Sequence, residues 1–162
     1  MLTTRHMRDE KTGRAIKAIG RPGTDTGQHY FTANTWMSDS RHIVISADID
    51  SAKTCAYVLF DTATGASRPL VDRAGWGSGV VSPDDRLYYI EGDTIRRVDL
   101  NTMETAAVCV HRPGCAFHGP LSVTNDGATI GVYWSEGERW IVGTVDIASG
   151  VISEAVAPAF AK

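Results

Sequence analysis

The sequence lacks the features of secreted, membrane-spanning and strongly charged proteins. It has only three cysteines among 162 residues, so at least one cannot pair within the chain, and a reducing, cytoplasmic setting is expected. No apolar run approaches the roughly 20 residues that span a bilayer. The N-terminal stretch M-L-T-T-R-H-M-R-D-E-K-T-G has no apolar segment after its charges, so no signal peptide is expected.

The sequence also has no large excess of charge of either sign. The net charge is −3, and 22% charged with 43% hydrophobic residues is an ordinary composition for a folded globular domain. No overall field would recruit nucleic acid or an anionic membrane surface, so neither is expected as a partner. The sequence contains no G-x-S-x-G, P-loop or G-x-G-x-x-G motif, and its one candidate helix, Arg14–Ile19, is too short.

What the sequence does contain is a repeated turn phrase. It reads S-D-S-R-H-I-V-I around Asp39, S-P-D-D-R-L-Y-Y-I around Asp84 and T-N-D-G-A-T-I-G-V around Asp126. Asp84 follows Asp39 by 45 residues, and Asp126 follows Asp84 by 42. Asp and Asn side chains bind the backbone of turns, and Gly adopts positive φ at little cost. Each phrase therefore predicts a turn that opens onto a strand.

A second turn phrase follows each copy of the first. It reads D-T-A-T-G from Asp61, D-L-N-T-M from Asp99 and D-I-A-S-G from Asp146, and it occurs once early as D-E-K-T-G from Asp9. The runs between the two phrases, such as I-V-I, Y-V-L-F, L-Y-Y-I and I-V-G-T-V-D-I, are β-branched and aromatic. Several are apolar on both faces, which is typical of strands covered on both sides.

About four short strands in a period of 42 to 45 residues is typical of a β-propeller blade. We therefore predict an all-β fold, a partial β-propeller spanning 1–162. About three four-stranded antiparallel blades would cover 28–72, 74–112 and 116–157. Residues 1–27 hold only the second phrase and one predicted strand, Arg14–Ile19. They would supply an outer strand of a closing blade.

Three blades do not close a ring, because propellers close with roughly four to eight. An open arc would expose an apolar blade face at each end. Two interpretations follow. The chain is the N-terminal part of a longer propeller, or copies of it associate to complete a ring.

Three segments resemble the N-terminal blades of oligogalacturonate lyases, seven-bladed propellers related to the TolB translocation protein. They read Q-H-Y-F-T-A-N-T-W-M-S-D-S-R-H-I-V-I, G-S-G-V-V-S-P-D-D-R-L-Y-Y-I and I-R-R-V-D-L-N-T-M-E-T. The resemblance extends from about Arg8 to Val156. The S-P-D-D and D-x-x-T-G phrases are shared by many TolB-like propellers, whereas H-Y-F and V-D-L-N-T-M-E-T are more typical of the lyases.

The resemblance implies a function in pectin breakdown. Oligogalacturonate lyases cleave oligogalacturonides in the cytoplasm by β-elimination. A divalent metal, typically manganese, is held by histidines and a glutamine and binds the uronate carboxylate, and a histidine accepts the C5 proton. The resemblance places that cluster in later blades. No ligand or base is therefore assigned among the five histidines here, which are His6, His29, His42, His111 and His118.

The chain is accordingly expected to serve as scaffold and part of the sugar site, without a cofactor of its own and without activity alone. Two other functions remain open. One is a non-enzymatic TolB-like propeller that binds a protein or peptide across its channel face. The other is a partial propeller whose copies assemble into a ring.

Three residues are candidates for substrate binding. His29, Trp76 and His118 stand 10, 8 and 8 residues before the first-phrase aspartates. That places them at the entrance of the innermost strands, predicted at 30–36, 76–81 and 117–123. Aromatic and imidazole groups there could stack on sugar rings or bind hydroxyls. The alternative is that Trp76 packs between blades and the histidines are solvated.

The stretch C-V-H-R-P-G-C-A-F-H holds four potential zinc ligands, Cys109, His111, Cys115 and His118. Their spacing departs from C-x₂₋₄-C, and a blade would separate them, so no metal site is predicted. The first-phrase aspartates are interpreted as turn formers rather than calcium ligands. Trp134 and Trp140, which flank S-E-G-E-R, are interpreted as cross-strand packing of a hairpin.

Overall fold

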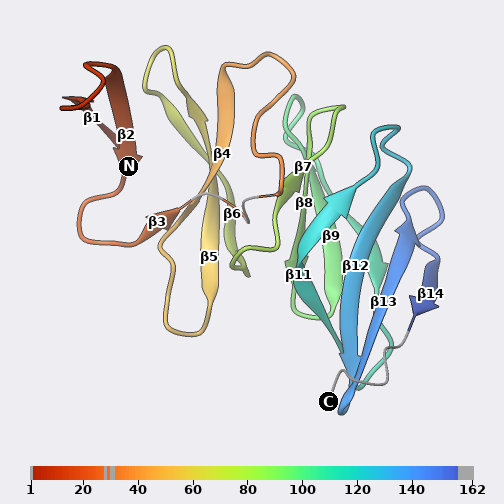
Figure 1. Cartoon of the computed structure of the whole chain (residues 1–162). Helices are drawn as coiled ribbons and strands as arrows, with labels where there is room; N and C mark the ends of the chain where they lie inside the picture. The colour runs from red at the N-terminus through yellow and green to blue at the C-terminus, as the bar shows by residue number, and fades with distance from the viewer. Residues whose placement is uncertain (1, 28, 30–31, 157–162) are drawn as a thin grey trace.

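The computed structural model describes residues 2–27, 29 and 32–156. Within these ranges every regular element is a β-strand, and the strands form one two-stranded sheet and three four-stranded sheets (Figure 1). All pairings are antiparallel. The predicted all-β fold of four-stranded sheets in an open arc is confirmed. The described residues hold no helix that could cross a membrane.

The strands of each sheet follow one another along the chain. The N-terminal hairpin consists of β1 (Thr3–Arg8) and β2 (Ala15–Gly20). The first sheet contains β3 (Thr26–Gly27), β4 (His42–Ala47), β5 (Thr54–Asp61) and β6 (Ser67–Gly75). The second contains β7 (Val80–Val81), β8 (Arg86–Glu91), β9 (Thr94–Asp99) and β10 (Thr105–Val110). The third contains β11 (Cys115–Val123), β12 (Thr129–Glu136), β13 (Arg139–Asp146) and β14 (Ile152–Val156).

The N-terminal region differs in detail from the sequence prediction. It forms two strands where one was predicted, and the D-E-K-T-G phrase is the turn between them. The short strand β3 pairs with β4 and so belongs to the first sheet. Of the innermost strand predicted at 30–36, residues 30 and 31 lie outside the described ranges, and Trp36 forms only an isolated bridge with Ile43. The first sheet therefore has a two-residue inner strand.

The second turn phrase folds in the same way at all four places. The backbone N–H of its fifth residue donates to the carbonyl of the Asp, and that fifth residue adopts positive φ. Gly occupies the fifth position three times, but Met103 takes it in the second sheet with φ 66°. The Asp carboxylate also accepts a hydrogen bond from the N–H three residues on, at 2.6 Å from Thr12, 3.3 Å from Thr64, 3.0 Å from Thr102 and 2.8 Å from Ser149.

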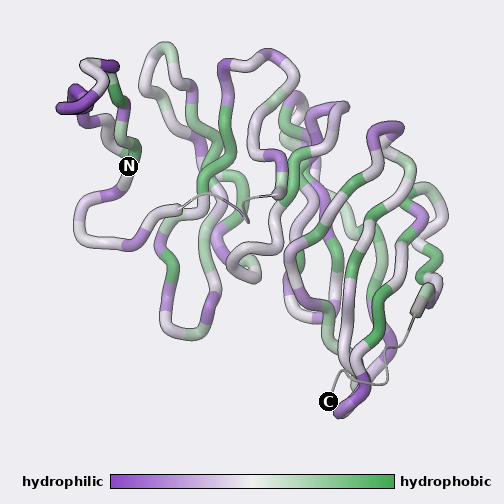
Figure 2. Tube along the Cα trace, viewed as in Figure 1, coloured by the Kyte–Doolittle hydropathy of each residue, from purple (hydrophilic) through white to green (hydrophobic). Residues whose placement is uncertain are grey.

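The second sheet is covered on both faces, as the doubly apolar L-Y-Y-I run predicts. Leu87 and Tyr89 are buried among residues of the first sheet, whereas Tyr88 and Ile90 are buried among residues of the third. Figure 2 shows hydrophobic residues along these strands and hydrophilic residues at many turns. Burying each such side chain stabilises the fold by about 1.5–3 kcal/mol. Packing of sheet on sheet is therefore the main source of stability.

Polar contacts fix how the sheets meet. The buried carboxylate of Asp85, in the first turn phrase of the second sheet, accepts hydrogen bonds from the Ser38 N–H at 2.6 Å and its hydroxyl at 2.7 Å. Asn34 bridges the same two sheets, because its side chain donates to the Val81 carbonyl at 3.0 Å. These directional bonds hold neighbouring sheets in one register.

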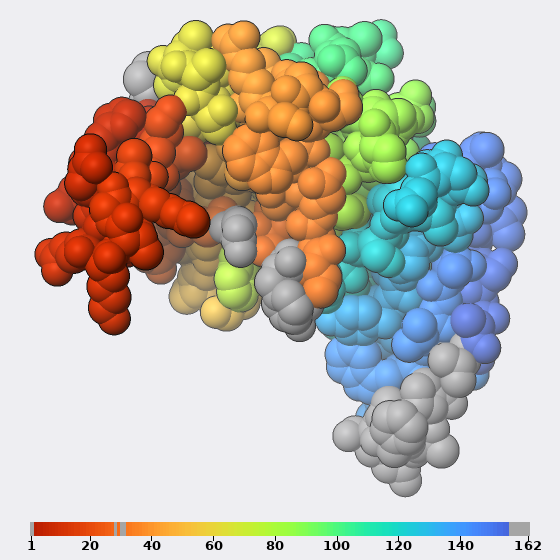
Figure 3. Space-filling view, turned by 45° about the horizontal axis from the view of Figure 1, so that its top comes forward, coloured from red at the N-terminus to blue at the C-terminus, as the bar shows by residue number. Residues whose placement is uncertain are grey.

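The N-terminal hairpin covers the free face of the first sheet. Leu2 is buried among Ile45, Val58 and Phe60, and Ile19 packs against the same cluster. Figures 1 and 3 show the hairpin at one end of the body and the third sheet at the other. The two ends of the arc therefore differ in what covers them.

The glycines of the second turn phrase allow a matched test. Gly65 and Gly150 have φ of 79° and 70°, but an added Cβ would lie 4.0 Å from the Thr4 hydroxyl at Gly65 and 2.5 Å from the Val108 carbonyl at Gly150. We expect Gly65→Ala to lower the free energy of unfolding by about 1–2 kcal/mol, from backbone strain alone. Gly150→Ala should lower it by about 1–3 kcal/mol more, because the added atom is also overpacked. Urea denaturation measures both; equal losses would contradict the close approach.

Candidate functional site

The inner edges of the three sheets are irregular, and their irregular segments lie against one another. β3 and β7 have two residues each, and β11 shifts register between His118 and Ser122. A Cβ on Gly79 would lie 2.7 Å from Cε1 of His29, and one on Gly119 would lie 2.7 Å from the Ser78 Cα. Only glycine permits such close approaches. The segments around residues 29, 77–79 and 119 are therefore adjacent in space.

The side chain of Tyr57 links the first sheet to the segment that leads into the second. Its ring is fully buried, and its hydroxyl accepts a hydrogen bond from the Gly79 N–H at 2.8 Å and donates to the Gly75 carbonyl at 3.1 Å. Ser78 bonds the same carbonyl at 2.6 Å and accepts the Ile90 N–H at 3.1 Å. Burial raises the pKa of Tyr57, so its phenol remains a proton donor at neutral pH. Sequence reasoning missed both residues, because each lies in an ordinary apolar or glycine-rich run.

His29 is buried rather than solvated. Its side chain lies edge-on to Tyr57, with ring centroids 4.9 Å apart, and the residue is only 3% exposed. Neither ring nitrogen has a hydrogen-bond partner among the described residues. Burial lowers the pKa of His29 to about 4, so the ring is neutral at pH 7. In this structure the imidazole packs against Gly79 and Tyr57 in the interior.

Trp76 is the exposed member of the three candidates. The residue directly follows the end of β6 and is 43% exposed. The backbone N–H donates to the Lys53 carbonyl at 2.8 Å, and the Lys53 ammonium lies 4.9 Å from the indole centroid. An exposed indole offers an apolar face of the kind that stacks on sugar rings, and the adjacent ammonium would attract a carboxylate.

His118 belongs to a group of three rings on the third sheet. Its Nε2 lies 2.9 Å from the Ser135 hydroxyl, and its ring centroid is 4.6 Å from that of Trp140 and 5.7 Å from that of Tyr133. Burial lowers the pKa of His118. The predicted packing of Trp134 against Trp140 is wrong, because Ser135 pairs with Trp140 and successive residues of β12 face opposite sides.

The segment 77–79 lies against the surroundings of two candidates. His29 contacts Gly79, the residue after His118 contacts Ser78, and Trp76 precedes both contact points along the chain. These contacts are made by the backbone of Gly79, Gly119 and Ser78 and by the buried ring of His29. Of the three candidates, Trp76 presents the largest free surface.

The four potential zinc ligands do not form a site. Cys109 is buried in the core between the second and third sheets. His111 accepts the Arg112 N–H at Nδ1 and packs between Phe117, at 4.7 Å, and Trp134, at 5.3 Å. Within the described ranges, no group of three or more His, Cys, Asp or Glu residues could hold a metal ion.

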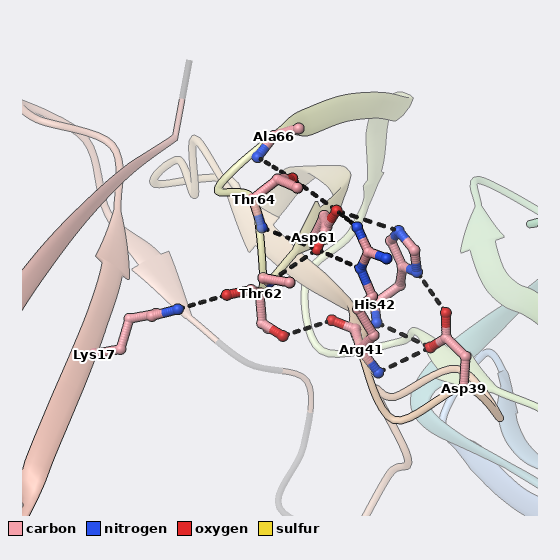
Figure 4. Close-up of polar contacts among 9 residues, drawn as sticks. Lys17, Asp39, Arg41, His42, Asp61, Thr62, Thr64 and Ala66 are labelled. Atoms are coloured by element: carbon pink, nitrogen blue, oxygen red, sulfur yellow. Dashed lines mark hydrogen bonds and ion pairs between the residues drawn. The ribbon is translucent and has the colours of Figure 1, made fainter.

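A polar network joins the two turn phrases of the first sheet (Figure 4). Arg41 binds the Asp61 carboxylate through two nitrogens, at 2.8 and 2.5 Å, and the Thr64 hydroxyl donates to the same group at 2.6 Å. These bonds hold the pKa of Asp61 far below its usual range. The backbone and ring of His42 lower the pKa of Asp39 to about 2. Sequence reasoning interpreted the aspartates as turn formers and missed Arg41 and His42.

This network borders a pocket of about 390 Å³ between the first and second sheets. Leu59 and Met103 supply apolar lining, and Asp39, His42 and Asp61 line its polar side. The residues do not fit a manganese ion, because their oxygens are already bonded. The Asp61 oxygens accept from Arg41 and Thr64, and the Asp39 oxygens are bonded by the backbone N–H groups of Arg41 and His42 and by the His42 ring. The network stabilises turns.

Comparison with known proteins supports the fold. Neither a family model nor a curated protein matches the chain. An oligogalacturonate lyase in complex with manganese matches with a TM-score of 0.83 and 20% identity, over 96% of this chain and 47% of that one. An oligogalacturonate lyase from Vibrio parahaemolyticus matches with TM-score 0.83 and 15% identity, over the same shares. A putative TolB from Agrobacterium tumefaciens matches with TM-score 0.63 and 12% identity, over 96% and 61%.

The chain thus has the fold of oligogalacturonate lyase and TolB-like β-propellers, as the resemblance predicted. It spans about half the length of the lyase structures that it matches. With three four-stranded sheets in an open arc, it is a partial propeller.

The burial of His29 predicts acid sensitivity. Its folded pKa of about 4 lies below the ordinary value of 6.5, so the unfolded chain binds the proton more readily. Stability should fall as the pH drops from about 6.5 to about 4, by about 3 kcal/mol from this group. His29→Phe should remove that part of the pH dependence, whereas His6→Phe, on the exposed face of β1, should retain it.

Urea denaturation between pH 7 and 4 measures the difference, and an NMR titration of the His29 ring tests the same point in the unmodified chain. A ring that titrates near 6.5 in the folded protein would contradict the buried, neutral state.

Proposed function

We propose that this chain is part of an oligogalacturonate lyase-like propeller, in which it supplies scaffold and one wall of the sugar site. The observation that supports the proposal is the match of fold over 96% of the chain, combined with the close approach of the segments around residues 29, 77–79 and 119. The chain spans about half the length of the matched lyase structures. In this proposal, further blades that carry the catalytic metal ligands complete the propeller. The expected setting is the cytoplasm, and the expected substrate a pectin-derived oligogalacturonide.

Within this proposal the candidate residues have different roles. Trp76 contacts substrate, because its indole is 43% exposed and the Lys53 ammonium beside it complements a uronate carboxylate. His118 presents a half-buried ring on β11, held by Ser135. His29 acts through Gly79, since its buried ring fixes where that backbone lies. All three contribute to binding, and none is assigned to bond cleavage.

Two equally exposed tryptophans allow a matched test of the sugar site. Trp76 and Trp36 are each 43% exposed, but Trp36 lies beside the first turn phrase, away from the entrances. We expect Trp76→Ala to weaken binding of a short oligogalacturonate by about tenfold, the loss of roughly one stacking contact. Trp36→Ala should leave affinity unchanged. Isothermal titration calorimetry measures both, with a neutral oligosaccharide as control ligand.

Equal losses in the two variants, or absence of binding by the unmodified chain, would overturn the sugar site. Binding of peptides in place of uronates would favour the TolB-like alternative.

The chain alone should not cleave its ligand. Incubation with digalacturonate and manganese is expected to give no unsaturated uronate, as followed by ultraviolet absorbance, because the described residues offer no metal site. Sustained product formation by the isolated chain, repeated after removal of trace contaminants by a second purification, would show that catalytic groups lie within it.

A further inference from the structure

The proposed sugar site does not use the pocket of about 390 Å³ between the first and second sheets. One wall of this pocket belongs to the first sheet, where Leu59 of β5 pairs with Arg68 of β6, so the two side chains share a face. Leu59 is buried in the core that the first and second sheets share, so that face is the one toward the second sheet. The second sheet supplies the other wall through Leu100 and Met103 of its second turn phrase. The pocket therefore lies between two sheets that both belong to this chain.

Met103 is the unusual residue of this lining. The other three copies of the second turn phrase have glycine at the same position, and all four residues adopt positive φ, which is 66° at Met103. A side chain at positive φ strains the backbone, whereas glycine avoids the strain. Met103 lines the pocket together with Met37. Methionine side chains are flexible and polarisable, and they adapt to apolar ligands. The strained position therefore gives the pocket an adaptable apolar wall.

Arg68 is the cation of this pocket that has no partner. Among residues 2–27, 29 and 32–156, its exposed guanidinium makes no hydrogen bond or ion pair. The carboxylates that line the pocket are already bonded, Asp61 by Arg41 and Asp39 by the ring of His42 (Figure 4). One positive charge thus remains to bind an anion.

The order of the strands keeps Arg68 away from Asp39. Asp39 is bonded to His42 at the start of β4, whereas Arg68 lies on β6, and β5 runs between these two strands. Neighbouring strands lie about 4.8 Å apart, so roughly 10 Å separates β4 from β6. The carboxylate on the intervening strand, Asp61, is paired with Arg41. An anion at Arg68 therefore meets little repulsion.

We infer that this pocket binds a small carboxylic acid with an apolar body, such as an aromatic acid. Its carboxylate pairs with the Arg68 guanidinium, whose planar fork matches two carboxylate oxygens. Its apolar body lies between Leu59 and Met103. One guanidinium balances the single charge of a carboxylate, and the apolar walls favour a ligand without further charge. The volume lies within the range of small-molecule pockets, roughly 300–1,000 Å³.

This ligand site is separate from the proposed sugar site. Arg68 is the second residue of β6, whereas Trp76 directly follows the last. The two residues therefore lie at opposite ends of a nine-residue strand. The inference goes beyond the proposed function and needs no further blade, because both walls of the pocket are present in the chain.

Two exposed arginines of β6 allow a matched test. Arg68 lines the pocket, whereas Arg73 lies on the same strand outside it. With phenylpropionate as the probe, we expect Arg68→Gln to weaken binding more than about tenfold, because the charge-assisted hydrogen bonds are lost. Arg73→Gln should leave the affinity unchanged. Isothermal titration calorimetry on the full chain measures both.

Met103→Gly tests the apolar wall of the same pocket. The variant has the residue that the other three turns use, so we expect the turn to form, and thermal unfolding checks that the fold is retained. Binding of phenylpropionate should weaken by about fivefold or more, because an apolar contact with the probe is lost. The uncharged analogue phenylpropanol should bind the unmodified chain and Arg68→Gln equally.

The inference is supported if Arg68→Gln and Met103→Gly both weaken phenylpropionate binding while Arg73→Gln does not. Absence of binding at millimolar probe overturns it, as does an equal loss in the two arginine variants. Loss of binding in Trp76→Ala but not in Arg68→Gln also overturns it, because the probe would then occupy the proposed sugar site. Arg68→Gln should leave binding of oligogalacturonate unchanged, so the two proposals fail separately.

Discussion

The structure depends on one constraint: a strand that is apolar on both faces must be covered on both. The L-Y-Y-I strand of the second sheet satisfies it, with Leu87 and Tyr89 against the first sheet and Tyr88 and Ile90 against the third. Because each sheet needs two neighbours, the arrangement is propagated along the chain rather than completed within it. The N-terminal hairpin covers one end, whereas Val142 of the third sheet, at the other end, is 45% exposed.

Much of this could be predicted from the sequence, because turn chemistry is local. The recurrence of the two Asp phrases is sufficient to place the turns, and the apolar runs between them are sufficient to indicate strands. The inner edge could not be predicted, because its conformation depends on contacts between sheets. β3 and β7 are two residues long, since close approaches at Gly79 and the bonds of Tyr57 replace a regular ladder there. Strand β1 was missed because T-T-R-H-M-R has no apolar pattern.

The candidate site shows the same division. The spacing predicted all three candidates at the entrances of inner strands, but only Trp76 precedes its strand, β7; His29 follows β3, and His118 is the fourth residue of β11. The structure also gives them unequal exposure, which no spacing could have indicated: Trp76 is open, His118 is half-buried among aromatic rings, and His29 is enclosed. The burial of a side chain depends on how closely the neighbouring sheet approaches it. At His29 that approach depends on Gly79, a residue that no functional motif would single out.

Met103 illustrates how the repeat tolerates variation. It occupies the left-handed position that glycine holds in the other three turns, and its side chain packs against the core between the first two sheets. The contact offsets part of the conformational cost of a side chain at positive φ. The turn at Asp99 therefore contributes to the packing between the first two sheets as well as connecting β9 to β10. The glycines at the three equivalent positions have no side chain that could make such a contact.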